Sequence, residues 1–177
     1  FVVTNTATAA AALGWMAVEW VYRGKPTVLG AASGAVAGLV AITPASGFVG
    51  PISSIIIGVV AGGLCFWAVM LKGRLGYDDS LDAVGIHGIG GTWGALATGL
   101  FASKAINAAG NDGLFFGNPG QLWIQFVAVL ASWVFAFVGT YVILKVVDAT
   151  MGLRVSDEDE QLGLDLSQHE ERAYSKS

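Results

Sequence analysis

Charged residues are missing from three long, strongly apolar parts of the chain, residues 26–71, 83–103 and 113–144. A helix needs about 20 predominantly apolar residues to cross the hydrocarbon core of a bilayer. The Thr-Pro-Ala-Ser-Gly sequence at 43–47 predicts a turn that divides the longest of these parts. We therefore expect five membrane spans, at residues 1–22, 27–43, 49–71, 83–102 and 121–147.

The composition agrees with a membrane protein. Of the 177 residues, 54% are hydrophobic and 12% are charged, whereas a soluble globular protein carries about 25% charged residues. The chain also holds 25 glycines, a residue type that is common where transmembrane helices pack closely. The sequence therefore predicts an all-α membrane protein, a bundle of transmembrane helices in the cell membrane.

Basic residues predict the orientation of the spans, because cytoplasmic loops carry an excess of lysine and arginine. With five spans, Lys104 alone falls on one side, and the other side holds Arg23, Lys25, Lys72, Arg74, Lys145 and Arg154. The richer side also holds residues 151–177, which we expect to form a cytoplasmic tail. No basic cluster indicates nucleic-acid binding.

Small residues recur four positions apart and predict close helix packing. The three series are Gly30, Gly34 and Gly38, then Gly58 and Gly62, then Gly91, Ala95 and Gly99. Trp93, in the middle of a span, is expected to serve packing, and Glu19, at a span end, is expected at the membrane interface.

His87 is the ionisable residue that the pattern places inside a span. It follows Asp82 by five residues, or about 7.5 Å of helix. Ionisable groups within spans usually face the protein interior and mark function, so His87 is a candidate for contact with a polar solute or for proton relay. The alternative is a histidine that hydrogen-bonds a neighbouring helix and serves packing.

Asp79 and Asp82 precede this span and have two interpretations. Carboxylates at the start of a helix cap free amides and interact favourably with the helix dipole. Alternatively, they orient the inner end of a pathway. No further His or Cys lies near enough in sequence to His87 to form a metal site, and neither a phosphate-binding loop nor a nucleophile triad is present, so we expect no metal, no cofactor and no enzymatic activity.

Four motifs together resemble the ammonium transporters of the Amt/Mep/Rh superfamily, and its Amt branch in particular. They are NTATAAAALGWMAVEW at 5–20, GKPTVLGAASGAVAGLVAITPASGFVGP at 24–51, DDSLDAVGIHGIGGTWGALATGLFA at 78–102 and GLRVSDEDEQLGLDLSQHEERAY at 152–174. Their order and spacing match the second part of that family's polypeptide, from its seventh span onward.

The resemblance implies a homotrimer in which each subunit conducts ammonium or ammonia through a narrow hydrophobic pore. His87 matches the second of two pore histidines, and Thr43 and Ala83 match positions near the pore. Ala83 is smaller than the branched residue usual there. Asp79 and Asp82 match an acidic pair that supports the inner end of the span.

The resemblance also implies that essential parts precede Phe1. The first pore histidine, the outer aromatic gate and half of the inverted repeat belong to earlier spans, so we expect this chain to be the C-terminal part of the transporter. The tail matches a regulatory segment, for which a PII-type signalling protein is the expected partner. Glu170 stands where the family commonly has glycine.

Two other functions stay open at this point. An ammonium sensor would use the same fold to bind the ion, with little net transport. A purely structural subunit would tolerate the replacement of His87 by alanine.

Overall fold

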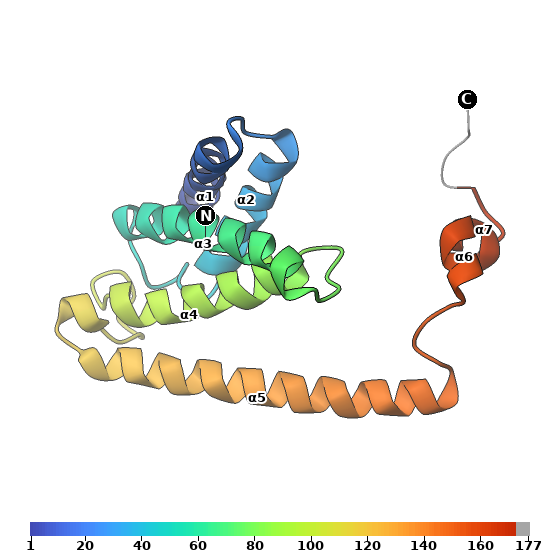
Figure 1. Cartoon of the computed structure of the whole chain (residues 1–177). Helices are drawn as coiled ribbons and strands as arrows, with labels where there is room; N and C mark the ends of the chain where they lie inside the picture. Colours follow the sequence, from blue (N-terminus) through green and yellow to red (C-terminus); the bar gives the residue numbers. More distant parts are fainter. Residues whose placement is uncertain (173–177) are drawn as a thin grey trace. The chain divides into compact units, whose positions relative to one another are not determined.

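The computed structural model describes residues 1–172, and their regular structure is entirely helical (Figure 1). The α-helices are α1 (Val2–Arg23), α2 (Val28–Ile42), α3 (Pro51–Leu75), α4 (Ile89–Phe101), α5 (Pro119–Thr150), α6 (Asp157–Leu162) and α7 (Leu164–Ser167). A π-helix, η1 (Val84–Gly88), runs directly into α4, and a short 3-10 helix, η2 (Leu114–Phe116), precedes α5. The expected helical fold class is therefore confirmed.

Each of the five predicted apolar stretches overlaps one of the first five α-helices, and α1, α3 and α5 extend beyond the predicted bounds. Within residues 1–172, two helices, α3 and α5, are long and apolar enough to cross a membrane, with mean hydropathies of 2.3 and 2.2. The α2 helix has 15 residues, fewer than the roughly 17 that a typical span requires. The count of five spans therefore stays a prediction.

Contacts divide the chain into two compact units, Phe1–Ala131 and Ser132–Ser177. The boundary lies within α5, whereas the sequence predicts a division at residue 150, between membrane helices and tail. Every described side chain of α5 is at least partly exposed.

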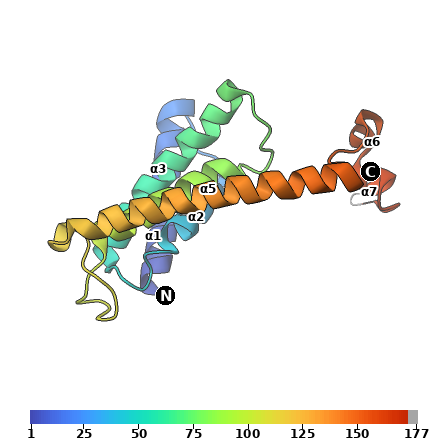
Figure 2. The same ribbon diagram turned by 90° about the horizontal axis from the view of Figure 1, so that it is seen from below.

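In the first unit, α1 packs against both α2 and α3, and the three helices lie together in both views (Figure 1, Figure 2). Glycines make the close approach possible. A Cβ atom added to Gly38 would lie 2.6 Å from the carbonyl oxygen of Ala7, and one added to Gly62 would lie 2.3 Å from that of Ala11. The packing role predicted for these two glycine series is confirmed.

The third predicted series is confirmed only in part. Gly99 packs closely, because an added Cβ would lie 2.8 Å from the Cα atom of Leu122 on α5. The glycines that meet α2 and α3, however, are Gly90 and Gly94, and a Cβ on Gly94 would lie 2.1 Å from the carbonyl oxygen of Ala41. A Cβ on Gly91 would meet only the Val40 side chain, at 3.8 Å. Both alignments space small residues by four, so the spacing alone could not predict which face meets α2.

Glu19 is buried between helices, with 2% of its surface exposed, and its expected depth at the membrane interface stays a prediction. Its carboxylate accepts hydrogen bonds from the backbone N–H of Thr27 at 3.1 Å and from Arg23 Nη1 at 3.2 Å. Thr27 caps α2, because its Oγ1 accepts from the Gly30 N–H at 2.9 Å. Burial of a carboxylate is tolerated where such donors satisfy it, and here they also fix the start of α2.

Contacts join the helix ends of the first unit in two groups. At one end, Arg23 Nη2 donates to the sulfur of Met70 at 3.2 Å, which links the ends of α1 and α3. At the other, the Ser103 N–H donates to the carbonyl of Phe48 at 2.9 Å and links the loops that follow α2 and α4. Alternate loops therefore gather at opposite ends of this unit.

The second unit contains the described part of the tail. Ser156 caps α6 through a 3.1 Å bond from the Asp159 N–H, and Arg154 pairs with Glu160 at 2.9 Å. Residues 173–177, with the last two residues of the 152–174 motif, lie outside the described residues.

Glu170 has a left-handed backbone, with φ of 54°, at the position where the resemblance expects glycine. A non-glycine residue in this conformation costs roughly 1–2 kcal/mol, and glycine avoids that cost. We therefore expect Glu170→Gly to slow hydrogen exchange of the next amide, Glu171, which donates to Asp165 at 2.8 Å. Glu171→Gly is the control, because its φ is not positive, and should loosen the same turn. Faster exchange in Glu170→Gly would contradict this explanation.

Candidate functional site around His87

His87 lies in the π-helix η1, and its side chain is exposed on the surface of this chain. The packing interpretation requires a hydrogen bond from the imidazole to a neighbouring helix, and residues 1–172 provide none. A neutral imidazole offers one donor nitrogen and one acceptor nitrogen. In the described chain both nitrogens are therefore open to a solute or to another part of the protein.

The π-helix is the feature of the site that sequence reasoning missed. π-turns are rare and occur frequently at functional sites. Gly85 and Gly88 flank the histidine, and Gly85 sits so close to α3 that an added Cβ would lie 2.8 Å from Val69 Cγ2. The glycines are a weak signal of this geometry, because they fit a regular helix packed against a neighbour equally well.

Asp79 caps the helix that carries His87. Its two carboxylate oxygens accept hydrogen bonds from the backbone N–H groups of Ala83 and Val84, at 2.8 and 2.9 Å. These bonds are the ones that the capping interpretation predicts, and the negative charge lies at the favourable end of the helix dipole.

Asp79→Ala should lower the free energy of unfolding by about 0.5–2 kcal/mol, the usual cost of removing a capping side chain. Asp78→Ala is the matched control, because Asp78 is exposed and accepts only a long 3.3 Å bond from Ser80. Thermal unfolding of the purified protein measures both. Equal destabilisation by the two substitutions would mean that the cap contributes nothing.

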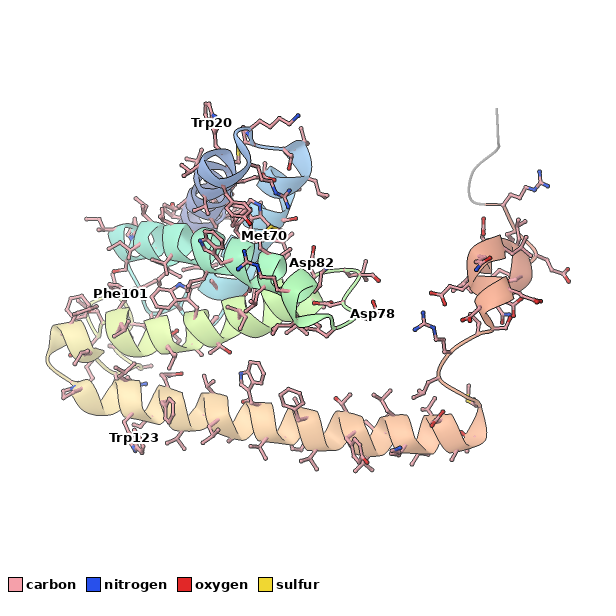
Figure 3. The ribbon with its side chains drawn as sticks, in the orientation of Figure 1. Trp20, Met70, Asp78, Asp82, Phe101 and Trp123 are labelled. Atoms are coloured by element: carbon pink, nitrogen blue, oxygen red, sulfur yellow. The ribbon has the colours of Figure 1, made fainter. Side chains whose placement is uncertain are left out.

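Asp82 pairs with Lys72 of α3 rather than capping the helix. Figure 3 labels Asp82 and Asp78 in the turn that joins α3 to the helix of His87. Lys72 Nζ also donates to the backbone carbonyl of Asp79, at 2.7 Å. Asp82 has a left-handed backbone, with φ of 56°, a conformation that aspartate tolerates better than most residues.

The two remaining candidates differ in their relation to His87. Ala83 is exposed, four residues earlier on the same helix. Thr43 is exposed at the C-terminal end of α2, where its hydroxyl donates to the Leu39 carbonyl at 2.7 Å. Since Gly94 of α4 meets Ala41 of α2, Thr43 lies about 13 Å beyond His87 along the helices. The structure therefore does not bring Thr43 beside the histidine.

No group of three or more His, Cys, Asp or Glu side chains within residues 1–172 could hold a metal ion. Cys65 is buried, and its thiol donates to the carbonyl of Ile86 at 3.8 Å. Through this contact Cys65, which lies on α3, packs against the backbone of the π-helix.

Two helices long and apolar enough to cross a membrane, close packing through glycine and an exposed histidine on a helix without other charges agree with an α-helical membrane protein that carries a polar site on one helix. The sequence model of the Ammonium Transporter Family matches residues 1–174. The chain therefore belongs to that family, as its motifs predicted.

Curated relatives and solved structures agree with this assignment. The chain is 58% identical to an ammonium transporter of Bacillus subtilis over 178 residues, which cover 100% of the chain and 44% of that protein. It is 51% identical to ammonium transporter Amt1 of Archaeoglobus fulgidus, covering 98% of the chain and 44% of the relative. The chain thus spans less than half the length of these relatives.

Among solved structures, Mep2 of Saccharomyces cerevisiae superposes with a TM-score of 0.85 at 38% identity, over 94% of this chain and 39% of Mep2. A sensor Amt protein superposes with a TM-score of 0.82 at 29% identity, over 94% of this chain and 40% of the sensor.

Proposed function

We propose that this chain is the C-terminal part of an ammonium transporter and conducts ammonium or ammonia across the cell membrane. The observation that carries the proposal is the 58% identity to the Bacillus subtilis ammonium transporter across the whole chain. The exposed, unpaired imidazole of His87 in residues 1–172 supports it, because a solute pathway needs polar groups that the protein does not satisfy itself.

In this proposal, spans that precede Phe1 complete an inverted repeat and cover the face of η1 and α4 that carries His87. They bring a second histidine to His87, and the two form a polar relay in a hydrophobic pore. Ala83 lines the pore near its inner end, Thr43 lies nearer its outer end, and Asp79 and Asp82 hold the inner end of the helix. Three such subunits form the functional trimer.

The proposed topology has five spans in this chain and a cytoplasmic C-terminus. The alternation of the spans is supported by the two groups of helix ends in the first unit, because Arg23 and Lys72 lie at one end and the loops after α2 and α4 meet at the other. The tail then reaches the cytoplasm, where a PII-type signalling protein is the proposed regulatory partner.

An ammonium sensor is the second candidate, because a sensor Amt protein shares the fold at a TM-score of 0.82. A sensor binds ammonium at the same site and passes little of it. Transport current and ammonium binding, measured on one preparation, therefore separate the two functions.

The test is the current evoked by ammonium in proteoliposomes that hold the purified protein, at fixed pH and without a potassium gradient. A transporter gives a transient current that saturates with ammonium and is absent from protein-free liposomes. Saturable ammonium binding without current would favour the sensor, and the absence of both would refute the proposal.

A further inference from the structure

One face of α3 makes three successive contacts with the segment that leads to His87. Cys65 touches the carbonyl of Ile86, Val69 packs against Gly85, and Lys72 binds the turn before the π-helix. These α3 residues are spaced by four and three positions, so they share one helix face. We call this row of contacts the α3 seam. It runs along residues 79–86 and ends one residue before His87.

Lys72 is the polar end of the α3 seam. Its ammonium group donates both to the backbone carbonyl of Asp79 and to the carboxylate of Asp82. The Lys72 and Asp82 side chains are only 25% and 29% exposed, so water screens this pair less than an open surface pair. One side chain thus holds both the capping residue and the strained residue of the turn.

An ordinary α-helix is the alternative conformation of the η1 segment. Closing η1 as an α-helix would shift the hydrogen-bond register by one residue, which corresponds to a rotation of about 100° per residue around the axis. His87 would then face a different direction relative to α4. Strained conformations such as the left-handed Asp82 backbone persist only where the surroundings hold them. Two backbone hydrogen bonds hold Asp82, to the Asp79 carbonyl and from the Ile86 N–H, and Lys72 is the side chain that binds its carboxylate.

We propose that Lys72 is a positioning residue for His87. By binding Asp79 and Asp82, it fixes the turn from which η1 starts, and so keeps the π-helical register that aims the imidazole. The inference rests on the proposed function, in which the direction of the imidazole decides whether a solute can use it.

The experiment uses the purified full-length protein with ¹⁵N-labelled histidine. The ring-nitrogen NMR signals of His87 are identified by their loss in His87→Ala. In Lys72→Met we expect these signals to move and the ammonium current to fall about tenfold or more, since a displacement of about 1 Å can cost as much as a hundredfold. Lys72→Arg should restore both. Arg74→Met, which removes an exposed charge two residues away, should change neither.

Unmoved His87 signals in folded Lys72→Met protein would overturn the proposal, whatever the current. If Lys72→Met does not fold, Asp82→Asn decides, because it removes the charge that Lys72 binds and keeps the shape. Shifted His87 signals then support the proposal, and unchanged signals overturn it. If His87→Ala itself transports normally, the proposed role of His87 in transport fails, while the NMR comparison still judges the role of Lys72.

Discussion

Replacing Gly94 by alanine is expected to destabilise the protein by about 1–3 kcal/mol, the usual cost of forcing an extra methyl group into a packed interior. The added Cβ would lie 2.1 Å from the carbonyl oxygen of Ala41 and 2.8 Å from its carbonyl carbon. Both are backbone atoms of α2, so relief requires α2 and α4 to move apart. That movement would loosen the packing of the helix that carries His87.

Gly91→Ala is the matched control on the same helix. Its Cβ would make an ordinary contact with the Val40 side chain at 3.8 Å, and alanine favours a helix over glycine by up to about 1 kcal/mol. We therefore expect unchanged or higher thermal stability for Gly91→Ala in detergent, against a clear loss for Gly94→Ala. Equal melting temperatures for the two variants would mean that α4 does not face α2 as described.

The long apolar runs were sufficient to predict where the main helices lie, because a membrane span requires them. They could not predict which face of α4 meets α2, since Gly90 and Gly94 share the spacing of Gly91 and Ala95. Nor could they predict the burial of Glu19. Its partner Thr27 lies in the next helix, and only the tertiary structure brings the two together.

The candidate site was predictable in part. A histidine in a charge-free stretch indicates function by its cost in a membrane, and Asp79 occupies a position from which a cap is expected. The π-helix and the role of Lys72 were not predictable. A π-turn needs no particular residue type, and Lys72 lies ten residues before its partner Asp82, on another helix. Thr43 was a candidate through the family resemblance alone, and the structure places it away from His87 along the helices.

Replacing His87 by alanine is expected to lower ammonium transport about tenfold or more, because a hydrogen bond to a charged group such as ammonium is worth about 1.5–3 kcal/mol and 1.4 kcal/mol is a factor of ten. Folding should change little, since the imidazole is exposed in this chain. His169→Ala is the matched control, because His169 is an exposed histidine in the tail. It should retain the wild-type transport rate.

The ammonium-evoked current of His87→Ala, compared with wild type and His169→Ala in proteoliposomes of equal protein content, tests the central claim most directly. The account predicts a saturating current for wild type and His169→Ala, and a strongly reduced or ion-unselective current for His87→Ala. A correctly folded His87→Ala protein with wild-type current and selectivity would contradict the claim and leave His87 a structural residue.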